Sequence, residues 1–187
     1  RAAALLLSGL GQNFVDAVDL ISQCQGNLIL SGVGKSGLIA QKISATMAST
    51  GTPSHFVHAS EAVHGDLGRI QGNDVVIILS NSGETEEVVR LLSPIKELGC
   101  RIIAMTSNDK SFLARHADLV LTIGSIEEAG PIGLVPTTST TAMLVLGDAL
   151  SVSVFQTREF SRADYARYHP GGSLGKKLMT VAEVMRP

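Results

Sequence analysis

Hydrophobic and polar positions along this chain follow two alternating patterns. Apolar residues spaced three and four apart are typical of amphipathic helices, and short continuous apolar runs are typical of buried strands. The first pattern predicts helices over residues 3–22, 36–49, 88–95, 111–116 and 138–155. The second predicts strands over residues 27–31, 55–57, 74–80, 101–105 and 118–123.

Strands that alternate with helices predict βαβ units with right-handed crossovers, and therefore an α/β fold whose mostly parallel sheet is covered on both faces. In such sheets ligands bind beyond the carboxyl ends of the strands. Four loops at strand ends carry unusual polar sequences: GVGKSG, HASEAVHGD, SNSGET and SIEEAGPIG. We therefore expect the functional site to lie among these four loops.

Composition excludes several classes of partner. The chain has 187 residues, enough for one domain, with 4% aromatic residues and a net charge of −2. Few aromatic rings and no basic block argue against nucleic acid. The apolar stretch 142–155 is interrupted by Asp148 and is too short to span a bilayer, which argues against a membrane partner. Cys24 and Cys100 lack metal-ligand spacing, which predicts reduced thiols in a cytoplasmic protein without a signal peptide.

The GVGKSG loop resembles a nucleotide P-loop but lacks its spacing. That motif needs a glycine five residues before the glycine of GKS, and Ile29 stands there. No nucleotide cofactor is therefore predicted. The loop can still bind one phosphate or hydroxyl group through backbone N–H groups, or it can be a plain turn with a solvated Lys35; the pattern leaves both open.

The SNSGET loop gives a more specific signal. Ser80, Ser82 and Thr85 lie between a predicted buried strand and a predicted helix, where free N–H groups attract an anion. The alternative is a helix cap formed by Ser82. One serine satisfies a cap, so three hydroxyl groups favour a phosphate site. A second hydroxyl-rich helix start, PTTSTTA at 136–142, indicates ligand contacts or subunit contacts equally.

The histidines and glutamates of two loops are candidates for chemistry. His58, Glu61 and His64 are close in sequence, but their spacing is not HExxH and no third ligand is near, so a polar substrate pocket is favoured over a structural zinc site. Glu127 and Glu128 stand beside a Gly-Pro turn. They are solvated carboxylates or, at the active end of a sheet, one of them is a general base.

Five segments together resemble one known family: SGVGKSG, ASTGTPSHFVHASEAVHGDLG, LSNSGETEE, GPIGLVPTTSTTA and YHPGGSLGKKL. They are similar to the sugar-isomerase (SIS) domain of arabinose 5-phosphate isomerases, which interconvert ribulose 5-phosphate and arabinose 5-phosphate for Kdo and lipopolysaccharide synthesis. The resemblance implies a three-layer αβα sandwich with a five-stranded parallel sheet, flavodoxin-like or Rossmann-like, over residues 1–179. It also implies that residues 180–187 begin a pair of CBS regulatory modules.

The resemblance further implies the members of the active site. The catalytic group would be Lys35, Glu87, Glu128 and His169. The substrate contacts, together with the hydroxyl loops, would be Ser31, Gly51, Thr52, His58, His64, Ser80, Asn81, Ser82, Thr85, Thr138 and Ser139. His58 is also a candidate for an inhibitory zinc ion. Family enzymes need no cofactor and are tetramers whose sites are shared between subunits, so the expected partners are a sugar phosphate and further copies of the chain.

An aldose–ketose isomerase moves a proton between neighbouring carbons through an enediol, which requires a base, a proton shuttle and a stabilising cation. We assign Glu128 as the carbon base, His169 as the shuttle or ring-opening group, and Lys35 as the cation. Glu87 would hold Lys35 or a sugar hydroxyl; alternatively, Lys35 and Glu87 form a plain ion pair.

Two rival classes stay open: another SIS-type sugar-phosphate isomerase, and a non-catalytic domain that senses a sugar phosphate. The joint presence of Lys35, Glu128 and His169 favours the enzyme. The predicted helix 138–155 is apolar on most sides, which predicts that it is buried all round, in part by a subunit interface.

Overall fold

The computed structural model describes residues 10–158, 160–170 and 185. Its first helix is α2 (Gln12–Ser22), with Gly11 as N-cap in an extended conformation. The predicted helix start is therefore wrong at Leu10 and Gly11, since glycine is a poor helix former. Residues 3–9 of that prediction, and the predicted boundary at residue 179, lie outside the described residues.

Five parallel strands form one sheet in the order β2-β1-β3-β4-β5. Their bounds are β1 (Leu28–Gly32), β2 (Ser54–His58), β3 (Val75–Leu79), β4 (Arg101–Thr106) and β5 (Leu119–Thr122). Every residue of β1 and β3 is buried, as expected for central strands covered on both faces. The predicted parallel sheet is confirmed.

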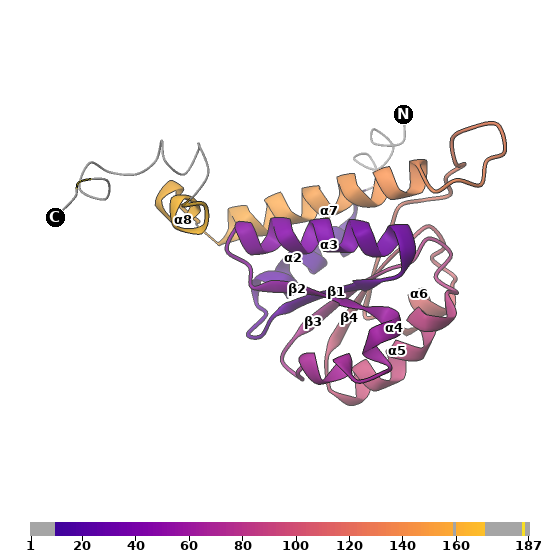
Figure 1. The fold of residues 1–187 in the computed structure, drawn as a ribbon, viewed down its shortest axis with the longest axis horizontal. Helices are drawn as coiled ribbons and strands as arrows, with labels where there is room; N and C mark the ends of the chain where they lie inside the picture. The colour runs from indigo at the N-terminus through magenta and orange to yellow at the C-terminus, as the bar shows by residue number, and fades with distance from the viewer. Residues whose placement is uncertain (1–9, 159, 171–184, 186–187) are drawn as a thin grey trace.

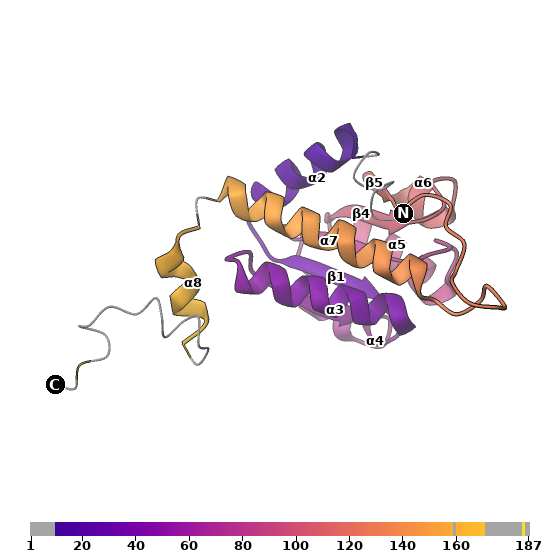
Figure 2. The ribbon, with the colours of Figure 1, turned by 90° about the horizontal axis from the view of Figure 1, so that it is seen from above.

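Helices cover both faces of the sheet and complete a three-layer sandwich (Figures 1 and 2). On one face, α2, α3 (Gly34–Ser49) and α7 (Thr138–Thr157) pack on Leu30 and Ile77. On the other face, α4 (Ala59–Ala62), α5 (Glu86–Glu97) and α6 (Phe112–His116) pack on Ile29 and Val76. Neighbouring strand residues point to opposite faces, so each strand supplies both cores.

Three short elements were not predicted: α4, the 3-10 helix η1 (Asp66–Arg69) and α8 (Arg162–Tyr168). The first two are too short to show a hydrophobic period. The third carries a readable signal, because Ser161 and Asp164 form a capping box at its start. In both ribbon views α8 lies beyond the end of α7, outside the three layers (Figures 1 and 2).

Helix α7 is longer than its sequence pattern indicated. Among the described helices it is the one long and apolar enough to cross a membrane by length and composition, with 20 residues and 44% of the tested window buried. The prediction that this stretch is too short was therefore wrong. The helix packs along α3, where Lys42 pairs with Asp148 and Gly147 leaves room for Ile43. These are the contacts of a core helix.

The amino ends of the strands hold the two cysteines. Cys24 and Cys100 are free thiols, as predicted. Between them, the buried Asp74 accepts hydrogen bonds from the N–H groups of Asn27 (2.7 Å) and Gln71 (2.8 Å). Burial raises the pKa of Cys100, and the nearby charge of Asp74 raises it further. Cys100 therefore stays a protonated core thiol.

Candidate active site

A cavity of about 280 Å³ lies at the carboxyl ends of β1 and β3. The chain order reverses between these two strands, because β2 lies on one side of β1 and β3 on the other. Ligands of open parallel sheets bind at this switch point. Seven residues line the cavity: Val33, Ser36, Leu79, Ser80, Asn81, Ser82 and Thr85.

Two helices point their amino ends at this cavity. The N-cap residues are Val33 for α3 and Thr85 for α5, and within the described chain neither side chain makes a capping hydrogen bond. The first N–H groups of both helices therefore remain available to an anion. The alternative that Ser82 caps α5 is wrong; its Oγ accepts instead from the N–H of Glu84 (3.2 Å).

The loop between β3 and α5 is shaped by its own hydroxyl groups. Ser80 Oγ accepts from the N–H of Gly83 (3.1 Å) and lies 3.0 Å from Thr85 Oγ1. Gly83 has a φ of +66°, a left-handed conformation that favours glycine. Ser80 is only 3% exposed, so it shapes the loop, while Asn81, Ser82 and Thr85 are left to meet a ligand.

Sequence reasoning missed Ser36, which lines the cavity from the first turn of α3. The signal was a hydroxyl group beside the GVGK turn, close to a helix amino end. Lys35 precedes it and is exposed, as is Glu87 on α5. No ion pair joins these two described side chains. The structure therefore does not support the plain ion-pair alternative.

His58 and His64 lie on the other side of β1. His58 ends β2, and its backbone pairs with Gly32 at the end of β1. Its Nδ1 accepts from the N–H of Ser60 (3.3 Å), so in the neutral ring Nε2 carries the proton and can donate to a ligand. His64 is exposed. In the described part of the chain, no three His, Cys, Asp or Glu side chains gather as a metal site would require.

The Glu128 carboxylate is bonded to the start of α7. It accepts from the N–H groups of Thr137 (2.9 Å) and Ser139 (3.2 Å), and from the Ser139 hydroxyl. Partial burial raises the pKa of Glu128, but these hydrogen bonds lower it more, so the net pKa is below its ordinary value. Ser139 is buried rather than exposed, and Thr138 is half-buried.

Helices α3 and α7 lie side by side and run the same way (Figure 2). Lys42 of α3 meets Asp148 of α7, and Ile43 meets Gly147. Because these contacts align the two parallel helices, the first turn of α3, which contains Lys35, is level with the first turn of α7. Glu128 is bonded to the start of α7, so it lies near Lys35. The fold thus gathers one group of predicted site residues at the carboxyl edge: Lys35, His58, His64, Ser80, Asn81, Ser82, Thr85, Glu87, Glu128, Thr138 and Ser139.

A second group lies at the opposite end of the sheet. Gly51 and Thr52 precede β2, so they are at the amino edge. The Phe160 ring lies against Gly51, where an added Cβ would meet it at 2.5 Å. His169 follows α8 at the same end of α7. The predicted site residues therefore form two groups, which one chain does not bring together.

Besides Ser80 and Ser139, two further predicted substrate contacts are buried. Ser31 is 1% exposed and Thr52 is 2% exposed, and neither hydroxyl has a hydrogen-bond partner among the described residues. Ser31 lies inside β1, between Val57 and Ile78 of the neighbouring strands. In this conformation neither hydroxyl is accessible to a ligand.

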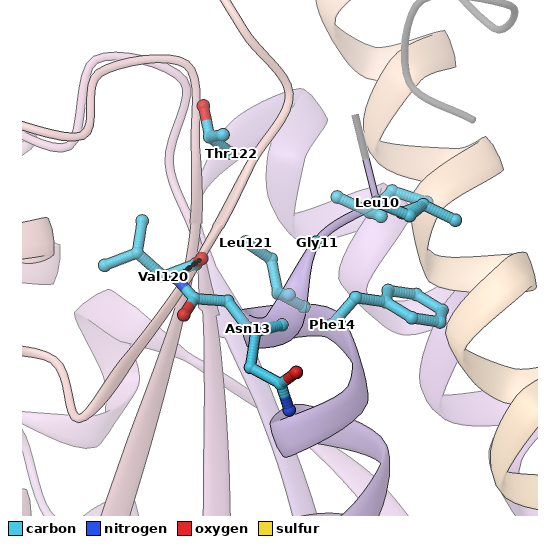
Figure 3. A pocket seen from close by; sticks show the side chains of 9 residues that line it. Leu10, Gly11, Asn13, Phe14, Val120, Leu121 and Thr122 are labelled. Carbon is cyan, nitrogen blue, oxygen red and sulfur yellow. Dashed lines mark hydrogen bonds between the residues drawn. The ribbon is translucent and has the colours of Figure 1, made fainter. Parts of the chain in front are cut away.

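A second hollow, of about 290 Å³, lies between the start of α2 and β5, and its lining side chains are drawn in Figure 3. Asn13 Nδ2 donates to the carbonyl of Val120 (3.1 Å) there and covers the edge of the sheet. Its lining is Leu10, Gly11, Gln12, Asn13, Phe14, Val120, Leu121, Thr122 and Leu146. Among the described residues that line it, none is charged and none is a predicted site residue, so it is not the candidate site.

A parallel sheet with two uncapped helix amino ends and a cluster of hydroxyl groups at its switch point is an arrangement suited to a small anionic ligand. The SIS domain family model matches residues 20–153. The chain therefore belongs to the SIS domain family.

Relatives in this family agree with that assignment. The chain is 53% identical to arabinose 5-phosphate isomerase KpsF of Escherichia coli O6:H1, over 90% of this chain and 52% of that protein. It is 49% identical to arabinose 5-phosphate isomerase KdsD of Pseudomonas aeruginosa, over 95% and 55% respectively. A solved structure of an E. coli CFT073 protein in complex with arabinose 5-phosphate has a TM-score of 0.88 and 44% identity, covering 90% of each chain. The chain spans about half the length of the curated relatives it matches.

Proposed function

We propose that this chain is the isomerase domain of a cytoplasmic arabinose 5-phosphate isomerase, which interconverts D-ribulose 5-phosphate and D-arabinose 5-phosphate for Kdo and lipopolysaccharide synthesis. The main observation behind the proposal is the hydroxyl-lined cavity at the switch point, with Lys35 in the first turn of α3 and Glu128 on the loop that is bonded to the start of α7. The names of the relatives supply the substrate. In this proposal a pair of CBS modules follows residue 179.

The phosphate of the sugar would sit on the amino ends of α3 and α5. Ser36, Ser82 and Thr85 donate hydroxyl hydrogen bonds to it. The phosphate does not change during isomerisation, so this site orients the sugar and holds its first two carbons near the reacting groups.

The proton transfers fall to the four predicted catalytic residues. Glu128 takes the proton from one carbon and returns it to the neighbouring carbon, and Lys35 stabilises the enediolate oxygen. Glu87 holds a sugar hydroxyl or, only once the substrate is bound, Lys35, since the two described side chains form no ion pair in this structure. Nδ1 of His169 donates to the carbonyl of Tyr165 (2.9 Å), so in the neutral ring Nε2 is free to accept a proton. That nitrogen suits a shuttle between the two sugar oxygens.

Glu128 must leave its hydrogen bonds at α7 to act as a base. Those bonds lower its pKa, which makes the carboxylate a weaker base while they last. Gly130 and Gly133 both have positive φ values on the same loop, of +102° and +60°. We propose that substrate binding moves this loop, frees the carboxylate and returns its pKa toward the ordinary range.

The complete site would be formed by two copies of the chain. The amino edge with Gly51, Thr52 and His169 lies opposite the carboxyl edge with Lys35 and Glu128. A neighbouring copy that places its amino edge against the cavity would supply the missing histidine. This arrangement supports the proposed tetramer with shared sites.

The proposed function is tested by a discontinuous assay with a panel of pentose, hexose and heptose phosphates. We expect conversion of arabinose 5-phosphate and ribulose 5-phosphate, unchanged by EDTA. Turnover of a hexose or heptose phosphate alone would indicate another SIS-type isomerase. Binding without turnover would indicate a sensing domain.

Replacing Ser82 by alanine is expected to weaken substrate binding. Ser82 lines the cavity, and a contact with the unreacting phosphate is similar in ground and transition states, so KM rises more than kcat falls. Steady-state kinetics check this, with Ser93→Ala, an exposed serine on α5, as the control. A collapse of kcat at constant KM would show that the loop does not bind the phosphate.

The protein is expected to be an oligomer at micromolar concentration. Helix α7 was predicted to be buried all round, yet within one chain its Val152 is 54% exposed, and Leu38 on the neighbouring α3 is 62% exposed. A subunit interface would cover these apolar side chains. Light scattering measures the mass directly, and a monomer would contradict both the interface and the shared site.

A further inference from the structure

The segment that begins with Thr106, the last residue of β4, holds the loop between β3 and α5 in place. The carbonyl oxygen of Asn81 accepts three hydrogen bonds from it: from the Ser107 N–H (3.1 Å), the Ser107 hydroxyl (2.7 Å) and the Thr106 hydroxyl (3.1 Å). Thr106 is fully buried. Neither Thr106 nor Ser107 is among the described residues that line the cavity. The first anchor of the loop is therefore a backbone oxygen held by a neighbouring strand.

A second anchor lies three residues further along the loop. Glu84 Oε1 accepts from the N–H of Phe112 (2.7 Å), the first residue of α6, and the carbonyl of Gly83 accepts from the N–H of Leu113 (3.0 Å). The packing at this point is close, because a Cβ at Gly83 would lie 2.1 Å from Ser111 Oγ. Glu84 does not line the cavity among the residues described. Its carboxylate ties the loop to α6.

Ser82 stands between the two anchors, and Thr85 directly follows the second. A flexible loop loses conformational entropy when it closes on a ligand, and a loop that is already held in the bound conformation avoids most of that loss. Hydroxyl donors are also most effective when they point at the anion before it arrives. The two anchors hold the loop in place before the phosphate binds, and they keep its hydroxyl groups pointed at the phosphate site.

We propose that Glu84, Thr106 and Ser107 are positioning residues for the phosphate of the substrate. They act through the loop that carries Ser82 and Thr85, without touching the ligand. The inference rests on the proposed function only in taking the cavity to be the phosphate site. It assigns a function to the β4–α6 segment, which the catalytic assignments leave unused.

Ser107→Ala and Glu84→Ala test the two anchors. We expect each variant to raise KM for arabinose 5-phosphate roughly three- to tenfold, the loss of one or two hydrogen bonds, with kcat within about twofold of the parent. The dissociation constants of arabinose 5-phosphate and inorganic phosphate, measured by calorimetry, should rise by the same factor.

Ser93→Ala and Glu97→Ala are the controls. They remove an exposed hydrogen-bonded pair at the far end of α5 and should leave all these values unchanged. Glu84→Gln should restore binding, since its amide oxygen still accepts from Phe112.

The binding measurements separate this inference from the proposed function. A wild-type protein that binds phosphate but isomerises nothing refutes the isomerase; weaker phosphate binding by the anchor variants would still support the anchors. Anchor variants that lower the melting temperature but keep the wild-type KM and dissociation constants would show a purely structural role and overturn the inference. A fall in kcat at constant KM would overturn it too.

Discussion

Replacing His169 by alanine is expected to lower kcat by about 10²- to 10⁴-fold, the usual contribution of a general acid–base group, while the protein stays folded and oligomeric. His169 stacks on Tyr165 at a ring distance of 3.9 Å and carries little of the core. The matched control is His116→Ala, because His116 has the same local geometry. It stacks on Phe112 four residues earlier and donates from Nδ1 to the carbonyl of that residue. Kinetics and melting temperature together check the prediction; full activity in His169→Ala would remove this residue from the mechanism.

The same variant tests which subunit supplies the histidine. Glu128 is bonded to the amino end of α7, and His169 follows α8 beyond the carboxyl end of α7, so the proposed shared site would take them from different copies. Co-expression of inactive His169→Ala and inactive Glu128→Gln chains with different affinity tags should give hybrids with part of the activity restored, because some sites then contain both native residues. Hybrids without activity would place both residues in the site of one chain and would contradict the shared site.

Replacing Glu128 by glutamine is expected to lower kcat by about 10²- to 10⁴-fold with little change in melting temperature. The amide oxygen of glutamine still accepts from the N–H groups of Thr137 and Ser139, so the start of α7 stays bonded, but the base is lost. Glu127→Gln changes the exposed neighbour and serves as the control. Near-full activity of Glu128→Gln, with a stability loss only in Glu128→Ala, would make Glu128 a helix cap and nothing more.

Glu128 also predicts a pH dependence of stability. Its pKa in the folded chain is below the ordinary value, so its contribution is present above the unfolded pKa and is lost as pH falls through the folded pKa. Stability of the parent should therefore fall in acid more steeply than that of Glu128→Gln. Melting curves across the acid range measure the difference; identical slopes would show that the carboxylate at α7 contributes nothing.

Local sequence patterns predicted much of the fold and the loop that lines the proposed phosphate site. The predicted strands match the five in the structure because continuous apolar runs are typical of strands buried on both faces. The SNSGET loop was recognisable because its hydroxyl groups and helix start are neighbours in sequence. Ser36, which was missed, is likewise a hydroxyl residue next to a helix start in the sequence. The capping box of α8 was also recognisable from the sequence, at Ser161 and Asp164.

The amino-acid sequence by itself therefore determined the five strands, the longer helices, the parallel direction of the strands and the loops that meet at the carboxyl edge, since periodicity and the alternation of elements are local properties. Only the tertiary structure showed that Glu128 bonds to the start of α7, that Asn81 and Glu84 are held by the β4–α6 segment, and that His169 lies at the far edge. These facts depend on the path of loops through space and on hydrogen bonds between residues distant in sequence. No spacing rule encodes them, because the same loop residues can adopt many backbone conformations until packing selects one.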